Sequence, residues 1–505
     1  MKQFLTSKVT SKWILCVLLI AFIFGLSACT SKQVQPTEVP AAADESDDMG
    51  SDRQEVPAAS GGSDEAAIER LEVHVATGGS DDTGSGTSEE PYATVSYAAR
   101  TMPGSVIVVH GGTYGPIRLD ADASGTEDSP TYIHPAEGET VVVKAEGEVC
   151  ISICNTSHIV IEGIETEGGT HGIDYESTRE AEDAALCDIT FRRCKVHGVR
   201  GVHGICVYAR NDLTAVSDLT VEECEVYDCQ CGSSESVVVN GNIDGFLISG
   251  NRVHDNNNIG IDMIGFEGTA MHPDQDSGKN QYEADRVRNG ICRDNVIYNI
   301  SAEGNDAYFE DGEYDLCADG IYVDGGCDIE ICNNFIFNCD IGLEVATEHS
   351  PEENEIFKVT GVSVHDNVIA DCRGWAGIGL GGCDPDLGFT EDCEFAYNTL
   401  VDNSTQIGVQ RSMNNRVYAN LILGGETAVE FNDDLSKEDM ENDISGNAAA
   451  DFEDEDSWTD EYGELFTDRE EAAEEFRSLI DGVGSRFVPD EDLMELYREN
   501  AGMEE

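Results

Sequence analysis

Three carboxylic acids occur in repeated segments of the chain that share a glycine and an apolar residue. Asp262 and Glu344 each follow a glycine and one apolar residue, and Asp324 ends the segment Gly-Ile-Tyr-Val-Asp. Alternate side chains of a strand point to opposite faces, so we expect the apolar residues to turn inward and these acids to turn outward. A cluster of outward carboxylates suits two chemistries, which are cation binding and acid–base catalysis.

In the first chemistry, Asp262, Asp324 and Glu344 bind Ca²⁺, a hard cation that takes several oxygen ligands. The ion neutralises the carboxylate of a uronate sugar while a base removes the C5 proton, which is β-elimination as polysaccharide lyases perform it. In the second chemistry, Asp262 and Glu344 are the acid and the base of glycoside hydrolysis. Two rungs of a stacked sheet separate their Cα atoms by ~10 Å, which allows the ~6.5–9.5 Å carboxyl spacing of inverting enzymes.

Candidate bases for the elimination lie beside these acids. The folded region holds few lysines, and Lys279 falls in an insertion that ends at Arg288. Tyr322 is also outward-facing and joins them as a candidate catalytic residue. Two further insertions, 302–318 and 347–360, flank the same segments, and loops on a rigid scaffold concentrate binding and catalysis. The centre of the repeat is therefore the predicted groove.

The elements that must position these residues form a repeat of roughly 22 residues, long enough for three short strands and their turns. It runs from about 158 to 432, and typical copies are DITFRRCKVHGVRGVHGICVY, GFLISGNRVHDNNNIGIDMIG and DIEICNNFIFNCDIGLEVATE. Stacking these coils buries a continuous core that one coil could not bury alone. The sequence therefore predicts an all-β, right-handed parallel β-helix, since parallel crossovers are right-handed.

Four columns of the stack can be assigned from the repeat. The first inward column is Phe191, Val221, Ile248, Cys292, Ile331, Val364, Phe395 and Val417. The second is Val196, Val226, Val253, Ile297, Ile336, Ile369, Leu400 and Ile422. The third, the residue after glycine, is Ile173, Ile205, Ile261, Ile321, Leu343, Ile378 and Val409. A turn column, Cys194, Cys224, Asn251, Asn295, Asn334, Asn367, Asn398 and Asn420, suits asparagine, which tolerates left-handed backbone and bonds to the coils above and below.

Cysteines share turn columns at two places, Cys194 with Cys224 and Cys339 with Cys372. Neighbouring rungs lie ~4.8 Å apart, within the Cα range of a disulfide. Either pair could be bridged, and a ladder of free stacked thiols is the favoured alternative because cysteine also behaves as a small buried hydrophobe.

Both ends of the stack need a cover. Residues 71–157 are assigned to an N-terminal cap and the first coils, with a short helix from Pro91 to Met102. Residues 433–505 lose the repeat and are expected to form an acidic helical tail over the last coil, with a helix from Thr467 to about Leu479 and another after Pro489.

The first 29 residues carry an export signal. Lysines precede an apolar run, and Leu-Ser-Ala-Cys resembles a bacterial lipobox, which implies lipidation of Cys29 and anchoring to the outer face of a bacterial membrane. Residues 30–70 are acidic and poor in apolar side chains, as in a disordered tether. With 101 acidic against 29 basic residues, the net charge of −72 disfavours nucleic acid as a partner. We expect a monomer that meets extracellular polysaccharide.

The motif "GSDDTGSGT…PYAT…PGSVIVVHGGTY", the asparagine ladder and the coil pattern resemble pectate-lyase-like β-helix proteins, most closely the family-nine polysaccharide lyases. The resemblance covers residues 71–432 and implies a groove along the third strands. That family carries the calcium motif Asp-Asp-Gly-x-Asp, whereas this chain has Asn258-Ile-Gly-Ile-Asp262 there, keeping only the glycine and the last acid. The family's catalytic lysine has no motif match.

Three functions therefore stand as hypotheses. The first is a calcium-assisted polysaccharide lyase, the second is a glycoside hydrolase or uronate epimerase, and the third is a non-catalytic carbohydrate-binding or structural β-helix. A binder would show a long row of exposed aromatic rings along the groove, and the sequence offers only Tyr208 and Tyr322 with Trp375 at the edge. The acids could also belong to the solvated face of a very acidic protein.

Overall fold

The computed structural model describes residues 70–178, 186–273, 280–382, 387–431, 441–450 and 483–500. Four predictions lie outside these residues, namely the export signal with Cys29, the tether, the candidate base Lys279 and the helix at 467–479. Within them, no helix has the length and apolar character needed to cross a membrane.

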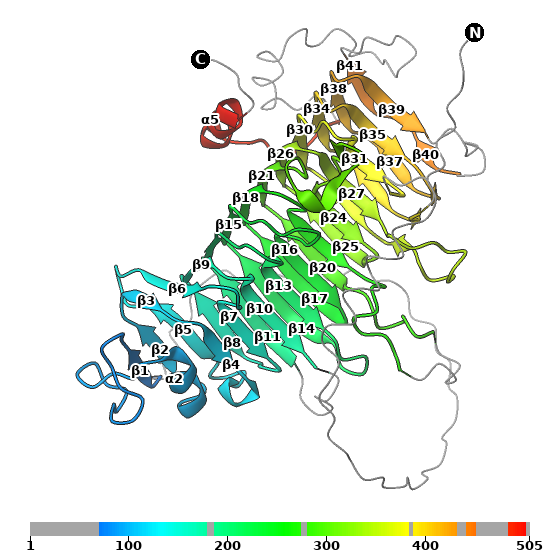
Figure 1. Ribbon diagram of the computed structural model, residues 1–505. Helices are drawn as coiled ribbons and strands as arrows, with labels where there is room; N and C mark the ends of the chain where they lie inside the picture. The colour runs from blue at the N-terminus through cyan, green and yellow to red at the C-terminus, as the bar shows by residue number, and fades with distance from the viewer. Residues whose placement is uncertain are drawn as a thin grey trace, which may run out of the picture. The chain divides into compact units, whose positions relative to one another are not determined.

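Parallel strands stack rung upon rung into three long sheets (Figure 1), which confirms the parallel β-helix. Sheet C, which carries the candidate site, has this order along the stack: β4 (Ile117–Leu119), β7 (Ile151–Cys154), β10 (His171–Ser177), β13 (His203–Ala209), β16 (Val237–Gly241), β19 (Ile261–Ile264), β24 (Asp319–Asp324), β27 (Ile341–Ala346), β31 (Ala376–Leu380), β35 (Thr405–Val409) and β39 (Thr427–Phe431).

The other two sheets complete each coil. Sheet A contains β1 (Glu72–Val75), β2 (Val106–Val109), β5 (Thr131–Pro135), β8 (Ile159–Glu162), β11 (Leu186–Arg192), β14 (Val216–Glu222), β17 (Ile243–Ser249), β20 (Arg288–Arg293), β25 (Cys327–Cys332), β29 (Ser363–His365), β33 (Glu394–Ala396), β37 (Arg416–Tyr418) and β40 (Asp443–Ile444), with the short β28 (Val359–Thr360), β32 (Thr390–Glu391) and β36 (Ser412–Met413) beside them. Sheet B contains β3 (Gly112–Tyr114), β6 (Val141–Ala145), β9 (Glu165–Gly168), β12 (Lys195–His197), β15 (Glu225–Tyr227), β18 (Arg252–Asn256), β21 (Val296–Ile300), β26 (Phe335–Cys339), β30 (Val368–Ala370), β34 (Thr399–Val401), β38 (Leu421–Leu423) and β41 (Ala448–Ala450).

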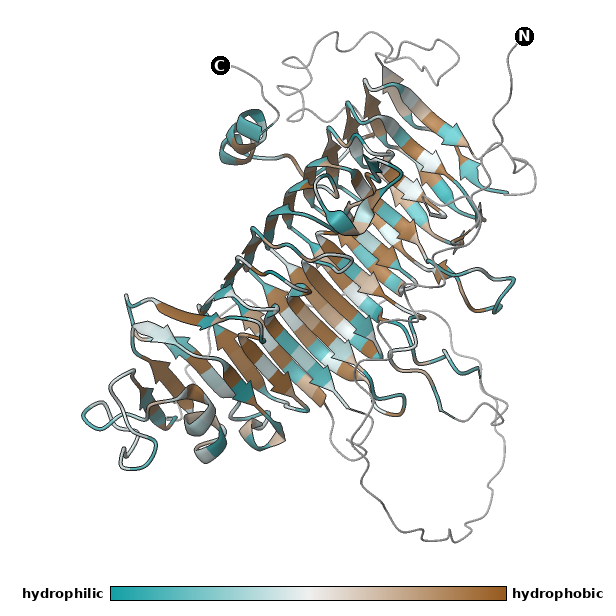
Figure 2. Cartoon of the chain, viewed as in Figure 1, coloured by the Kyte–Doolittle hydropathy of each residue, from teal (hydrophilic) through white to brown (hydrophobic). Residues whose placement is uncertain are grey.

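The inward columns follow the register of these sheets. Phe191 pairs with Val221 on sheet A, and Val196 pairs with Val226 on sheet B. Both columns continue as predicted, and in Figure 2 the apolar residues form bands that cross neighbouring strands. The third column is right except at its last member, because Ile378 pairs with Ile407 rather than Val409. Full burial of one such large side chain contributes about 1.5–3 kcal/mol.

The asparagine ladder is present and extends one rung further, to Asn447. From Asn295 onward, each side-chain oxygen accepts from the backbone N–H and the amide of the previous rung, as Asn398 does from Asn367 at 3.1 and 3.0 Å. The left-handed backbone, however, belongs to the residue before the asparagine, such as Asp294 and Asn333, both at φ 57°. Asparagine is therefore selected for its stacked amide and not for its backbone conformation. Every cysteine in the described ranges is a free thiol.

The N-terminal segment is already part of the stack, because β1 pairs in parallel with β2. The expected helix is α2 (Val95–Thr101), and it begins after Thr94, whose hydroxyl accepts from the N–H of Tyr97, rather than at Pro91. Single 3₁₀ turns, η1 (Ala121–Ala123) and η2 (Asp306–Tyr308), interrupt the loops. The short hairpin β22 (Phe309–Glu310) and β23 (Glu313–Tyr314) lies in the insertion at 302–318.

The C-terminal helix α5 (Glu491–Asn500) packs on the outer face of sheet B. Its Tyr497 ring lies 5.4 Å from the ring of Phe337, and Asn500 bonds to Asn299 at 2.9 Å. Arg486 binds Asp366 beside a pocket of about 380 Å³ that Cys332 and Phe487 also line. The described part of the tail therefore covers the side of the stack rather than its last coil.

The outer face of sheet B also carries a column of stacked rings. His197, Tyr227, His254, Tyr298 and Phe337 stack in turn, with centroids 4.7–5.2 Å apart and interplanar angles of at most 15°. The ring faces contact one another along the stack.

Candidate functional site

The predicted acids meet in one outward column of sheet C. Asp262 pairs with Tyr322, and Tyr322 pairs with Glu344, so the two acids lie two rungs apart. Asp324 is two residues further along β24, on the diagonal. These side chains do not form a solvated face, because Asp262 and Glu344 are each only 2% exposed and Asp324 only 4%. Burying three acids together is costly unless protons or cations compensate the charge.

Insertions border sheet C on both of its edges. Residues 265–287, after β19, and 347–358, after β27, leave at the edge where strands end. Residues 301–318, before β24, arrive at the edge where strands begin. From one of these loops, the backbone N–H of Glu348 donates to Asp324 at 3.0 Å. From another, the Tyr308 hydroxyl accepts from the Asn258 amide at 3.1 Å. Two of the insertions therefore contact this part of sheet C, one at Asp324 and one at Asn258.

Burial and mutual repulsion dominate the electrostatics of this cluster. Desolvation raises the pKa of the Asp262 carboxyl well above its ordinary value, and the charges of neighbouring acids, first Glu235 and then Asp324, raise it further. Desolvation and the charge of Glu344 raise the pKa of Asp319 in the same way. The largest charge influences on these carboxyl groups all come from other acids. A proton or a bound cation would relieve this repulsion.

An aromatic ring covers the end of the column beyond Glu344. Glu344 pairs with Gly379, which pairs with Gly408. A Cβ atom added to either glycine would lie 2.4 or 2.3 Å from the indole of Trp375, so this ring lies directly on the two glycines. Trp375 is half-buried. A partly exposed indole beside a pair of acids is a natural surface on which a sugar ring can stack.

Of the candidate bases, the described chain places Tyr322 between the acids but not Arg288. Lys279 lies outside the described residues. Arg288 stands at the start of β20 on sheet A, where its guanidinium donates to Asp244 at 3.1 Å and to Asn242 at 3.0 Å. Those contacts explain its position, since a guanidinium pairs best with carboxylate and amide oxygens.

Sequence reasoning missed Asp319, which is 3% exposed and belongs to the same cluster. The signal was available, because Asp319 precedes the repeated glycine just as His171 and His203 do. The structure pairs His171 with His203 at that position of their strands. The sequence pattern marks the residues after the glycine as outward, and the column of residues before the glycine was not included. Glu235 was missed because its own coil lacks the glycine.

A second acidic group adjoins the first and could hold a cation. One carboxylate oxygen each of Glu267, Asp324 and Glu348 lie within 4.8 Å of one another. His349 contacts Glu267 at 3.0 Å. Of the expected calcium ligands, only Asp324 belongs to this group, so the structure divides the expected site between two neighbouring clusters.

The chain is similar in sequence and in fold to several known proteins. A family model described as "Periplasmic copper-binding protein (NosD)" matches residues 277–461. The uncharacterized protein YwoF of Bacillus subtilis (strain 168) is 32% identical over 387 residues, which cover 72% of this chain and 76% of that protein. Among solved structures, GH136 lacto-N-biosidase from Eubacterium ramulus superposes with a TM-score of 0.54 at 13% identity, over 75% of this chain and 67% of its own. Pectate lyase Pel9A has a TM-score of 0.46 at 15% identity, over 69% of this chain and 80% of its own.

The identity to the biosidase is low, so that superposition shows a shared fold and nothing further. The identity of 32% to YwoF extends over most of both chains, and the NosD model matches a shorter part of this chain, residues 277–461. The chain therefore belongs to the family of YwoF, and in this member the family's fold is a NosD-like right-handed parallel β-helix.

Proposed function

We propose that this protein is a polysaccharide-degrading enzyme that hydrolyses glycosidic bonds with paired carboxyl groups on sheet C. The observation that carries the proposal is the column Asp262–Tyr322–Glu344, which holds two almost fully buried acids two rungs apart. That spacing of ~10 Å between Cα atoms suits an acid and a base with a water molecule between substrate and base.

The two acids have different roles in this proposal. Burial and neighbouring negative charge raise the pKa of Asp262, so it retains the proton that a general acid must deliver to the leaving oxygen. Glu344 is the carboxylate that activates water. Tyr322 separates the two carboxyl groups, and Trp375, one rung beyond Glu344, supports a sugar ring of the substrate.

Calcium-assisted β-elimination is the second candidate, and one observation favours it. Glu267, Asp324 and Glu348 bring three carboxylate oxygens together beside the column, as a Ca²⁺ site requires. The ion would pair with the carboxylate of a uronate substrate, and Lys279 or Tyr322 would remove the C5 proton. A uronate epimerase would begin with the same proton removal.

The proposed place of action is outside the cytoplasm. The basic and apolar leader ending at Cys29 supports export with a lipid anchor. The description of the matched family model as periplasmic supports the same conclusion. The partner would then be an extracellular polysaccharide, and the membrane would be contacted through the anchor alone.

One experiment separates these functions. The full-length chain in detergent is incubated with neutral and uronate polysaccharides, with Ca²⁺ or with a chelator. New reducing ends and the ultraviolet absorbance of an unsaturated sugar are measured together. Hydrolysis gives reducing ends without that absorbance, whereas elimination gives both and requires Ca²⁺.

The variants Asp262→Asn and Glu344→Gln should each lower hydrolysis by at least about 100-fold, since general acid–base catalysis contributes 10²–10⁴-fold. Asp82→Asn, at an exposed position far along the chain, is the matched control. Wild-type rates in both site variants would refute the role of the column. A lack of either product on every glycan would leave a binding scaffold as the better description.

A further inference from the structure

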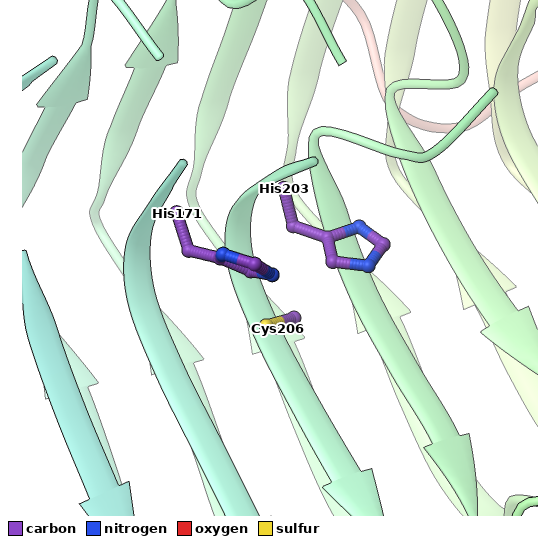
Figure 3. A group of neighbouring side chains, drawn as sticks. All are labelled: His171, His203 and Cys206. Atoms are coloured by element: carbon purple, nitrogen blue, oxygen red, sulfur yellow. The ribbon is translucent and has the colours of Figure 1, made fainter. Parts of the chain in front are cut away.

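A group of nitrogen and sulfur ligands lies on sheet C, two and three rungs before Asp262. His171 begins β10, His203 begins β13, and Cys206 follows three residues later (Figure 3). One imidazole nitrogen of each histidine and the Sγ of Cys206 all lie within 4.8 Å of one another. His203 and Cys206 are 3% and 0% exposed. The strand register brings the three together, because His171 pairs directly with His203.

The Nδ1 atom of each histidine already has a partner. His171 Nδ1 lies 3.1 Å from the hydroxyl of Thr170. His203 Nδ1 lies 3.3 Å from the backbone oxygen of Glu235 and 3.2 Å from its carboxylate. Metal-bound histidines are held in this way, with the second nitrogen donating to a carbonyl or carboxylate, so that the first is fixed as a ligand. The Nε2 atom of His171 is thereby left for an ion, whereas that of His203 contacts the Tyr208 hydroxyl at 3.0 Å, a contact that the ion would replace.

A carboxylate oxygen beside the sulfur is a candidate fourth ligand. The thiol of Cys206 donates to Asp174 Oδ1 at 3.3 Å, and Asp174 and Cys206 are direct partners across the sheet. Two imidazoles, one sulfur and one carboxylate are four donors of the types that zinc binds in tetrahedral sites. Ca²⁺, a hard cation that takes six to eight oxygen ligands, would bind weakly to these nitrogen and sulfur donors.

We propose that His171, His203 and Cys206 bind one Zn²⁺ ion, with Asp174 available as its fourth ligand. Zinc bonds of about 2.0–2.3 Å bring tetrahedral ligands to about 3.3–3.8 Å from one another, so small rotations of side chains close the site. The thiol proton leaves to the buffer when the sulfur binds the ion. The site stands on its own donor set and is independent of the glycan chemistry proposed above.

A second group of similar composition provides an internal control. Glu330, Cys332 and His365 also bring a carboxylate, a sulfur and an imidazole together. Both nitrogens of His365 are engaged there by acids, at 2.8 Å with Asp366 and 3.0 Å with Glu330. Acids hold both sides of that imidazole, whereas His203 has one acid at Nδ1 and only a tyrosine hydroxyl at Nε2, so Cys332→Ser should leave zinc binding unchanged.

The test uses the full-length chain, stripped with a chelator and then titrated with Zn²⁺ against a competing dye, with the bound metal measured by mass spectrometry. We expect one tightly bound zinc per chain and at least 100-fold weaker binding of Ca²⁺ at the same site. With Co²⁺ in place of zinc, a sulfur-to-cobalt charge-transfer band should appear with the visible bands of tetrahedral cobalt. Cys206→Ser should remove the charge-transfer band.

Two further variants keep the proposal testable if Cys206→Ser fails to fold. His171→Gln changes a half-buried side chain and should weaken zinc binding at least about tenfold. Glu235→Gln, which changes only the group behind His203, should weaken it about 10–100-fold. The proposal is overturned if the cobalt band persists in Cys206→Ser or disappears in Cys332→Ser. It is equally overturned if the wild-type chain retains no stoichiometric zinc.

Discussion

The indole of Trp375 rests on the backbone of Gly379, where an added Cβ atom would lie only 2.4 Å from Cζ3 of the ring. Gly379→Ala should therefore push the indole off the sheet, because the backbone beneath it cannot recede. We expect a change in tryptophan fluorescence together with weaker glycan binding. The control is Gly115→Ala, since an added Cβ there meets no atom within 4 Å. An unchanged emission spectrum in Gly379→Ala would contradict the contact.

Asp262→Asn should stabilise the fold while it removes activity. The pKa of Asp262 is higher in the folded chain than in the unfolded chain, first through burial and then through neighbouring acids. Its contribution to stability is therefore complete below the unfolded pKa of about 3.9 and is lost as pH rises through the folded pKa. Thermal unfolding of Asp262→Asn and wild type should differ little at pH 4, and the variant should melt higher at pH 8.

The same comparison with Asp82→Asn should show no such pH-dependent gain, because Asp82 is exposed. Measurements are made without divalent cations, since a bound cation would itself relieve the repulsion. A lower melting temperature for Asp262→Asn at pH 8 would show that the carboxylate is stabilised by a contact and not merely buried.

Asn367→Ala should destabilise the β-helix because it interrupts the ladder in mid-stack. The Asn367 amide donates to Ile331 O and Asn398 Oδ1 at 3.0 Å, and its oxygen accepts from the backbone of Asn334. Each buried partner left unsatisfied costs about 1–3 kcal/mol, so the free energy of unfolding should fall by at least that amount. Denaturant unfolding measures the change, and Glu137→Ala, at an exposed position, is the control.

Acid should release the C-terminal segment from sheet B. Burial pushes the pKa of Asp366 upward, but hydrogen bonds from Arg486 and His365 outweigh it and hold that pKa well below its ordinary value. This contribution is present above the unfolded pKa of about 3.9 and is lost as pH falls through the folded pKa. Limited acid proteolysis should therefore cut near 483–500 before it cuts the stack.

Arg486→Gln should produce the same exposure at neutral pH. The guanidinium is largely solvent-exposed, so the cost in stability should be no more than about 1 kcal/mol. Binding of a hydrophobic dye to the uncovered rings of Phe335 and Phe337 reports detachment. Equal dye binding by wild type and variant at both pH values would contradict this role of the ion pair.

Most of the fold could be predicted from the repeat in the sequence. Alternation and the asparagine column located the inward residues on sheets A and B, because stacking requires like residues at like positions. The error at Val409 arose where Gln406 replaces the glycine that marked the column. The position where α5 docks could not be predicted. In the sequence, the apolar residues on the outer face of sheet B look the same as residues of the interior.

The candidate site was only partly accessible to the same reasoning. Asp262 and Glu344 followed from the repeat, since both stand at one position of the coil. Their burial did not follow, because loops at 301–318 and 347–358 have no repeat from which to infer their path. Arg288 was expected near the groove by its position in the sequence, but the coil turns there and carries it onto sheet A.

The long insertions around sheet C leave the register beneath them intact. Residues 265–287 and 301–318 lie between β19 and β24, yet Asp262 still pairs with Tyr322 and Ile261 with Ile321. Loop length and strand alignment are thus independent variables in this molecule. An evolving lineage could lengthen, shorten or exchange the loops, and so change which substrate is admitted, without having to rebuild the scaffold at each attempt.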